Sequence, residues 1–125
     1  MDDRYRKAAG SAAEDRALAH LLEQGLRLVA RNYRCRLGEI DLVMLDGATL
    51  VLVEVRYRSS AAFGGAVASV TLQKQRRLIG AARHLLATRA ELRKLAARFD
   101  VVTLDGLRER PKIRWIRNAF VAERE

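Results

Sequence analysis

The sequence predicts a single α/β domain over residues 1–125, with α+β as the borderline alternative, built on a central mixed sheet of five strands flanked by helices. Three observations carry this prediction. The chain of 125 residues is long enough for one real core, and 50% of its residues are hydrophobic. Apolar residues recur at helical spacing in some segments and at strand spacing in others. The resulting order is helix, three strands, helix, two strands, which is typical of a sheet covered by helices.

The first helix is expected over residues 8–24, where Gly25 is a natural terminator. Glu14 lies on its apolar stripe, so a carboxylate points toward the core. Two interpretations of Glu14 are open. If the helix begins at Ser11, then Ser11 and Glu14 form a capping box, whereas an earlier start leaves Glu14 available for a site. The stripe itself consists of Ala13, Ala17, Leu18, Leu21 and Leu22.

Three strands are expected next, over residues 26–34, 39–46 and 49–58. The last two form a hairpin around Asp46-Gly47, because Asp-Gly between apolar runs is a strong turn signal. The strand over 49–58 is apolar on both faces except at its charged end. This pattern favours a central position in the sheet.

Charged side chains gather on one face of this hairpin. Because strand side chains alternate, a loop of even length brings Glu39, Asp41, Glu54 and Arg56 to the same face. A four-residue loop sets Asp41 opposite Glu54, and a two-residue loop sets Glu39 opposite Glu54. Opposed like charges destabilise a sheet, so three carboxylates here require cations. Arg56 supplies one positive charge, and Mg²⁺ or Mn²⁺ would supply the rest.

Residues 59–70 are small and include Gly64-Gly65, so we expect a loop that leaves the charged end of the hairpin and acts as a flap or an inert connector. The clearest helix follows over 71–88, with Ser69 or Thr71 as its cap. Its expected core-facing residues are Leu72, Leu78, Ile79, Ala82, Leu85 and Leu86.

Polar and basic residues cluster in the first turns of that helix, namely Gln73, Lys74, Arg76 and Arg77. Cations are misplaced there, because the helix dipole favours anions at a helix start. A bound phosphate would resolve the conflict, and a solvated charged face is the alternative.

The rest of the chain supplies two further strands. Residues 89–97 are expected to form a helical or irregular connector, and residues 98–104 a buried strand. Pro111 precedes a last strand over 112–117.

The net charge of +9 favours a polyanionic partner, most often nucleic acid, over a merely soluble basic surface. No apolar run approaches membrane-spanning length, and the polar N-terminus lacks the core of a signal peptide, so we expect a cytoplasmic protein without membrane contact. Cys35 is the single cysteine, which excludes an intramolecular disulfide and a cysteine-based zinc site.

Five separated blocks carry a family resemblance: GEIDLVMLDG, VLVEVRYRSS, FGGAVASVTLQKQ, ARFDVV and WIRNAF. They are similar to the YraN family of small, uncharacterised bacterial proteins. The order of a helical Glu, a strand Asp, a Glu-x-basic strand and a following helix with Gln and Lys also resembles the PD-(D/E)XK nuclease superfamily. That superfamily includes restriction enzymes and archaeal Holliday-junction resolvases. The resemblance implies a restriction-endonuclease-like fold and, because resolvases act as dimers, a homodimer.

The resemblance also implies a metal site. Asp41, Glu54 and the backbone carbonyl of Val55 match the superfamily's ligands for Mg²⁺ (or Mn²⁺). Glu14 matches the helical position that reaches the metal directly or through water. Ile40 stands where the superfamily places Pro.

The basic position of the motif departs from the superfamily, since Arg56 stands where Lys is usual. An arginine does not deprotonate in a protein, so Arg56 cannot be a general base. It can still position a water or hold a phosphate oxygen with its planar fork. Lys74 is the candidate for the missing ammonium group.

Two functions follow, and whether the chain is an enzyme stays open between them. One is a metal-dependent endonuclease that acts on DNA, including branched or recombination intermediates, with catalytic residues Asp41, Glu54, Arg56, Glu14 and Lys74. The other is a non-catalytic nucleic-acid-binding protein with a retained nuclease fold. Its phosphate contacts would come from Arg56, Arg58, Gln73, Lys74, Arg76 and Arg77, with Glu39 and Glu54 paired to Arg56 and Arg58. A third, purely structural interpretation treats the hairpin charges as an ion-pair network.

Overall fold

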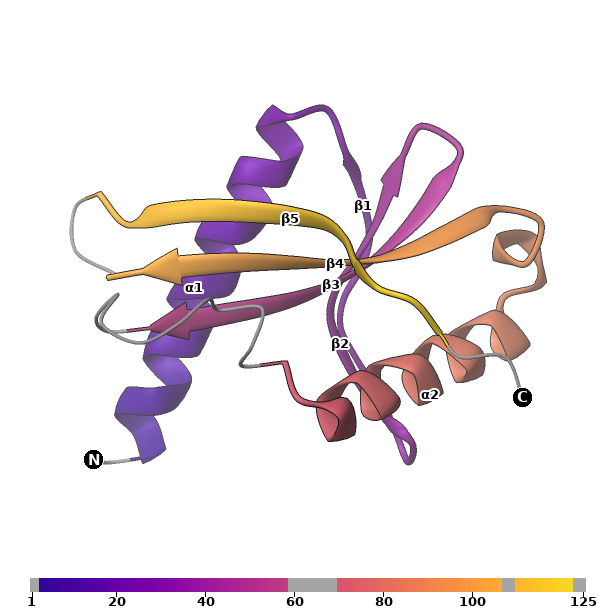
Figure 1. The fold of residues 1–125 in the computed structure, drawn as a ribbon, viewed down its shortest axis with the longest axis horizontal. Helices are drawn as coiled ribbons and strands as arrows, with labels where there is room; N and C mark the ends of the chain where they lie inside the picture. Colours follow the sequence, from indigo (N-terminus) through magenta and orange to yellow (C-terminus); the bar gives the residue numbers. More distant parts are fainter. Residues whose placement is uncertain (1–2, 59–69, 107–109, 123–125) are drawn as a thin grey trace.

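The computed structural model describes residues 3–58, 70–106 and 110–122, and in them a sheet lies between two helices (Figure 1). The helices are α1 (Asp3–Glu23) and α2 (Leu72–Thr88), with the short 3-10 helix η2 (Ala90–Leu92) after α2. The strands are β1 (Arg27–Cys35), β2 (Gly38–Asp46), β3 (Thr49–Arg58), β4 (Ala96–Asp105) and β5 (Lys112–Phe120). The predicted α/β class is confirmed, and the arrangement is that of a restriction-endonuclease-like domain.

The sheet has the strand order β1-β2-β3-β4-β5. Neighbours pair antiparallel except β3 and β4, which are parallel. A parallel pair needs a long crossover, and the chain makes it through α2. β3 is therefore the central strand, as its apolar pattern predicted, and the segment 50–53 within it is buried.

Each face of the sheet carries its own apolar cluster, because successive side chains of β3 alternate between the two faces. On one face, Val51 and Val53 pack with buried residues of α1: Ala13, Ala17 and Leu21. On the other face, Leu50 and Leu52 pack with Leu78, Ala82 and Leu85 of α2. Glu54 and Arg56 have the parity of Leu52 and so belong to the α2 face.

Leu72 was expected to face this core, and that expectation is wrong, since its side chain is 65% exposed. It is the first residue of α2, and the first buried residue of that helix is Leu78. The opening turns of α2 extend past the apolar cluster and lie over the charged end of β3 instead.

The hairpin brings the two acids of the motif close to each other. Leu42 pairs with Val53 and Asp46 with Thr49, so the turn is Gly47-Ala48, one residue further along than predicted. Gly47 has φ 59°, a left-handed conformation that suits glycine. Regular pairing ends at Leu42–Val53. Just beyond it, the Asp41 carboxylate accepts a hydrogen bond from the Val55 N–H, and the charge of Glu54 is close enough to raise the pKa of Asp41.

Helix α1 begins well before Ser11, at Asp3. The capping-box interpretation of Glu14 is therefore wrong, because a residue in the middle of a helix has no free N–H groups to cap. The N-terminal segment has few apolar residues, which is why its sequence gave no sign of the earlier start.

The loop after β3 and the end of β5 also differ from what the sequence predicted or lie outside the described residues. The predicted loop over 59–70 lies outside the described residues except for Val70. β5 continues three residues past its predicted end, to Phe120, whose ring stacks on Phe99 with centroids 5.0 Å apart. In the described part of the chain, neither helix combines the length and apolarity that crossing a membrane requires.

Candidate functional site

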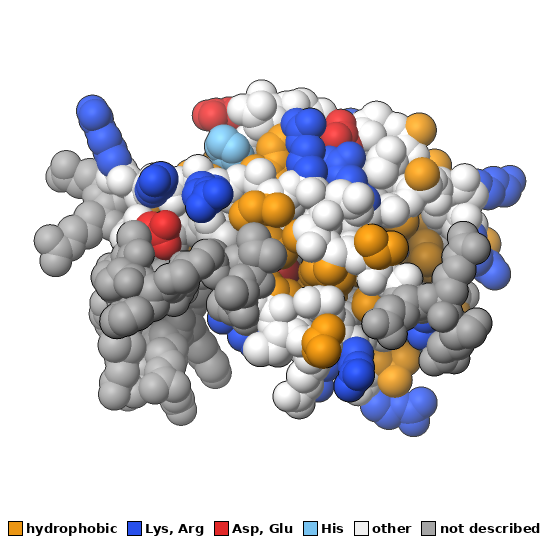
Figure 2. Space-filling view, in the orientation of Figure 1, with side chains coloured by type: hydrophobic (Ala, Val, Ile, Leu, Met, Phe, Trp, Pro, Cys, Tyr) orange, Lys and Arg blue, Asp and Glu red, His pale blue; other side chains and the backbone are white. Residues whose placement is uncertain are grey.

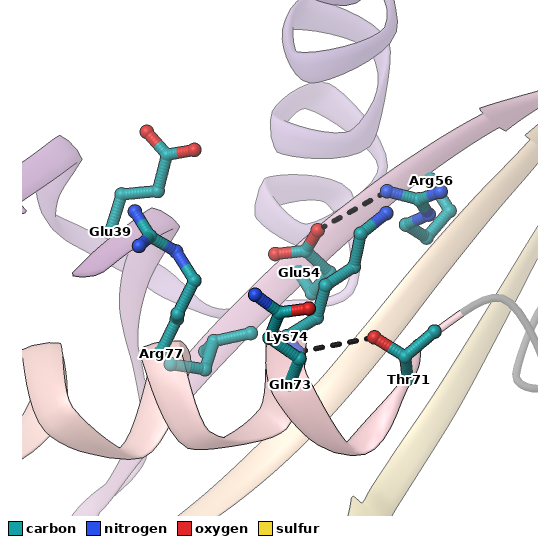
Figure 3. Close-up of a pocket in the computed structure, with 8 residues that line it drawn as sticks. Glu39, Glu54, Arg56, Thr71, Gln73, Lys74 and Arg77 are labelled. Carbon is teal, nitrogen blue, oxygen red and sulfur yellow. Dashed lines mark hydrogen bonds and ion pairs between the residues drawn. The ribbon is translucent and has the colours of Figure 1, made fainter.

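A cavity of about 550 Å³ lies between the first turns of α2 and the charged end of β3 (Figure 3). Thr71 is the cap of α2, because its hydroxyl accepts a hydrogen bond from the Lys74 N–H at 3.2 Å. This cap confirms one of the two predicted candidates and fixes the turn that carries the polar side chains. The lining residues are Glu39, Glu54, Arg56, Thr71, Gln73, Lys74, Arg77 and Leu78.

Asp41 lies at the edge of this site, where regular pairing of β2 with β3 ends. Its Oδ2 accepts a hydrogen bond of 2.8 Å from the main-chain N–H of Val55. Burial, and then the charge of Glu54, raise the pKa of Asp41 to about 8, although the Val55 hydrogen bond acts in the opposite direction. The charges of Glu14 and Glu39 make smaller contributions to the same rise in pKa.

Glu54 is the second acid of the pair, and its side chain is 14% exposed. Burial raises its pKa, whereas the positive charges of Arg56 and Lys74 lower it. The Arg56 guanidinium lies 3.7 Å from the Glu54 carboxylate, and Lys74 reaches toward both from α2 (Figure 3). Two neighbouring desolvated carboxylates resist simultaneous ionisation, so this pair favours a cation between them.

Glu14 comes close enough to Asp41 to affect its pKa. Its carboxylate is held by Arg31 of β1, with Nε 3.4 Å from Oε1. The same guanidinium contacts Asp15 at 2.5 Å. Arg31 therefore ties α1 to the sheet at the level of the site, a role that no local sequence pattern indicated.

The remaining predicted residues lie at different places relative to the cavity. Gln73 and Arg77 line the cavity, whereas Arg76 is exposed on α2 and is absent from the lining. Arg58 pairs with Asp105 in the β3–β4 register, and its side chain lies outside the description. Glu39 was expected to pair with Arg56 or Arg58, but its ion pair is with Arg34, at 3.3 Å. Arg34 lies directly opposite Glu39 in the β1–β2 register, which explains the choice.

The fit of a divalent ion can be tested on the donor set. Among the described residues, no three side chains of His, Cys, Asp or Glu form a metal-holding group. Mg²⁺, however, usually takes only one or two protein carboxylates and completes its shell with water. Asp41 and Glu54 supply two oxygen donors of this kind, and burial disfavours two uncompensated negative charges at this place. The pair therefore fits Mg²⁺ or Mn²⁺.

A second charged cluster lies away from the cavity, around Asp100 of β4, which is 0% exposed. Its carboxylate accepts hydrogen bonds from Arg98 (3.0 and 3.2 Å), Trp115 Nε1 (2.8 Å) and the Asn118 N–H (2.9 Å). Arg98 also contacts Asp46 at 2.8 Å. The cluster joins the hairpin end of β2 to β4 and β5. The signal for it was an aspartate within the apolar run of β4.

Comparison with known proteins places the chain among relatives of similar length. A family model described as "Uncharacterised protein family UPF0102" matches residues 13–104, which contain Glu14, Asp41, Glu54 and Lys74. A UPF0102 protein of Cupriavidus taiwanensis is 58% identical over 120 residues, covering 94% of this chain and 86% of that protein. One of Pseudomonas entomophila is 51% identical over 121 residues, covering 96% and 98%. One of Ralstonia nicotianae is 57% identical over 121 residues, covering 93% and 88%. The chain thus belongs to the uncharacterised protein family UPF0102, the YraN family that its sequence blocks predicted.

Proposed function

We propose that this protein is a Mg²⁺-dependent (or Mn²⁺-dependent) endonuclease-like hydrolase that acts on DNA phosphodiesters, including branched or recombination intermediates. The observation that supports this most is the partly buried pair of Asp41 and Glu54 beside a cavity lined by Arg56, Lys74 and Arg77. Desolvated carboxylates favour a divalent cation, and cations around a cavity favour a phosphate. A phosphodiester is the substrate that satisfies both.

The residues divide the work by their chemistry. Asp41 and Glu54 would hold the metal, which supplies a Lewis acid for the phosphate and lowers the pKa of the attacking water. Arg56 stays cationic and can bind a non-bridging phosphate oxygen through its fork while Glu54 orients it. Lys74 can neutralise charge that develops on the phosphate in the transition state. Glu14 would support Asp41 from α1, with Arg31 holding it in position.

The test is cleavage of supercoiled, single-stranded and four-way-junction DNA with Mg²⁺ or Mn²⁺. We expect cleavage by the wild-type protein and a loss of roughly 10²–10³-fold in Asp41→Asn and Glu54→Gln. The matched control is Glu23→Gln, which removes an exposed carboxylate from the far end of α1 and should cleave normally. Equal activity of Asp41→Asn and Glu23→Gln would contradict the metal assignment.

A second candidate function is binding of nucleic acid without turnover, and Arg56 in place of Lys is the observation that favours it. Metal binding separates the two candidates. Calorimetric titration with Mn²⁺ should give a binding isotherm for the wild-type protein and none for Asp41→Asn if the site is catalytic. Binding of DNA without binding of Mn²⁺ or Mg²⁺ would support the second candidate, a nucleic-acid-binding protein without turnover. The implied homodimer is tested separately, by light scattering of the purified protein in solution.

A further inference from the structure

We propose that β5 forms a second phosphate-contacting surface, in which Arg114 and Lys112 continue the cation set of the cavity across the sheet. The inference rests on the proposed function. It adds the path that a bound nucleic-acid backbone follows outside the cavity. No local pattern in the sequence indicated it, because it depends on how three strands align.

The alignment is given by two registers. Arg56 of β3 pairs with Thr103 of β4, and Thr103 pairs with Arg114 of β5. Directly paired residues in a sheet share a face. Arg56, Thr103 and Arg114 therefore form one row across three neighbouring strands, on the same face as Glu54. Adjacent strands lie 4.7–4.9 Å apart, so the two arginines are about 10 Å apart at their Cα atoms.

The neighbouring row carries a further cation. Asp105 of β4 pairs with Lys112 of β5 in the same antiparallel register, two residues from the first row. Lys112 and Arg114 are both exposed, and neither forms an ion pair with another described residue. Thr103 between the two arginines is 1% exposed and neutral. The row through Thr103 thus carries two cations: Arg56, which is paired with Glu54, and Arg114, which has no ion pair among the described residues.

The helix on this face leaves the row open. α2 packs chiefly on β2, with fewer contacts to β1 and β3, so it covers the opposite half of the sheet. Figure 1 shows α2 crossing below the sheet while β5 forms the edge away from β1. In Figure 2, Lys and Arg side chains appear at several separate places on the visible face. The cations of β5 therefore lie on a part of the sheet that α2 does not cover.

A nucleic-acid backbone is the ligand that this geometry favours. Arg114 and Lys112 are exposed cations on one strand, and they continue the positive charge that Arg56 and Lys74 place at the cavity. A polyanion with regularly repeated phosphates satisfies both arginines and Lys112 together, and arginine forks match phosphate oxygens. A backbone lying across the strands would pass from Arg56 at the cavity to Arg114 at the sheet edge.

The experiment is DNA binding measured by anisotropy of a labelled duplex of about 30 base pairs, in EDTA, from about 50 to about 200 mM NaCl. Each phosphate contact adds about 0.9 to the slope of log K against log salt. We expect Arg114→Gln to lower the magnitude of this slope by about one and Arg114→Lys to preserve it. The matched control is Arg93→Gln, an exposed arginine beyond the opposite end of β4 that should behave like the wild type.

The outcomes separate this inference from the proposed function. If the wild-type protein shows no salt-dependent binding of DNA, the proposed function fails and the inference fails with it. If the wild type binds steeply and Arg114→Gln equals Arg93→Gln, only the inference fails. Binding of phosphatidylserine vesicles that is lost in Arg114→Gln, with DNA binding unchanged, would also overturn it. Because the Arg114 side chain is exposed and forms no ion pair with a described residue, the variant should melt like the wild type.

Discussion

The main-chain N–H of Val55 donates a hydrogen bond of 2.8 Å to the Asp41 carboxylate, just past the last regular pair of the β2–β3 ladder. A side chain thus takes the acceptor role that a strand carbonyl has elsewhere in the sheet. The position of the acid is fixed by the central strand itself, and its oxygens remain beside Glu54. The hydrogen bond and the neighbouring charge act on the pKa of Asp41 in opposite directions, and burial decides the outcome.

The raised pKa of Asp41 predicts that stability depends on pH. The folded protein keeps the Asp41 proton up to about pH 8, whereas an ordinary aspartate releases it near 3.8. The folded state therefore binds more protons between these values, and the free energy of unfolding falls as pH rises through this window. From about pH 5 to about pH 8, the wild type should lose roughly 2–4 kcal/mol more than Asp41→Asn in urea unfolding.

The control for this prediction is Asp105→Asn, at the end of β4, which should keep the pH dependence of the wild type. Mg²⁺ adds a separate readout at about pH 8, where it should raise the melting temperature of the wild type and leave that of Asp41→Asn unchanged. A wild-type stability that is flat over the whole range would contradict the burial of an ionisable Asp41. An unchanged melting temperature with Mg²⁺ would contradict only the metal site.

The Asp100 cluster predicts a large loss of stability on truncation. Asp100→Ala leaves Arg98 and the Trp115 N–H without their buried acceptor, which should cost about 3–5 kcal/mol of the free energy of unfolding. Asp105→Ala, on the same strand but without a described ion pair, should cost less than about 1 kcal/mol. Urea unfolding measures both. Equal losses in the two variants would show that the cluster adds no stability.

The approach of β2 to α2 predicts that Gly38 positions the helix. A Cβ at Gly38 would lie 2.0 Å from the Arg77 carbonyl oxygen, so Gly38→Ala must push α2 away from the hairpin. We expect a loss of roughly 1–3 kcal/mol or more in thermal unfolding. DNA binding at low salt should weaken as well, because Arg77 and Lys74 move with the helix.

The control for Gly38 is a second glycine with open space around it. A Cβ at Gly10 of α1 meets nothing within 4 Å, so Gly10→Ala should stabilise the helix by roughly 0.5–1 kcal/mol. A Gly38→Ala variant as stable as Gly10→Ala would mean that α2 can move away from β2 with no loss in the free energy of unfolding.

Much of this fold could be predicted because its signals are local. The alternating valines and leucines of β3 identify a central strand, and Asp-Gly marks the hairpin to within one residue. The same alternation predicted that Asp41 and Glu54 lie close together, and the charge of Glu54 does affect Asp41. The early start of α1 was missed, since the sequence of its first turns carries no apolar stripe.

Interactions between distant segments could not be read in the same way. The pairing of Glu14 with Arg31 depends on how α1 lies on β1, and that of Asp100 with Trp115 on the register of β4 with β5. Glu39 forms its ion pair with Arg34 because Arg34 lies directly opposite it on β1, the strand that pairs with β2. Sequence patterns determine which face a side chain occupies, whereas the partner on that face depends on the assembled sheet.

The parallel pair of β3 and β4 has a consequence for the order of folding. The meander β1–β2–β3 and the β4–β5 hairpin close short loops, whereas the β3–β4 pair joins segments separated by the whole of α2. Contacts between residues distant in sequence form slowly, because closing the long loop lowers the chain entropy before the contact can contribute any stabilisation. We therefore expect docking of β4 on β3 to be the rate-limiting event. Asp41 and Glu54 come together in the early meander, but the row from Arg56 to Arg114 exists only after that event.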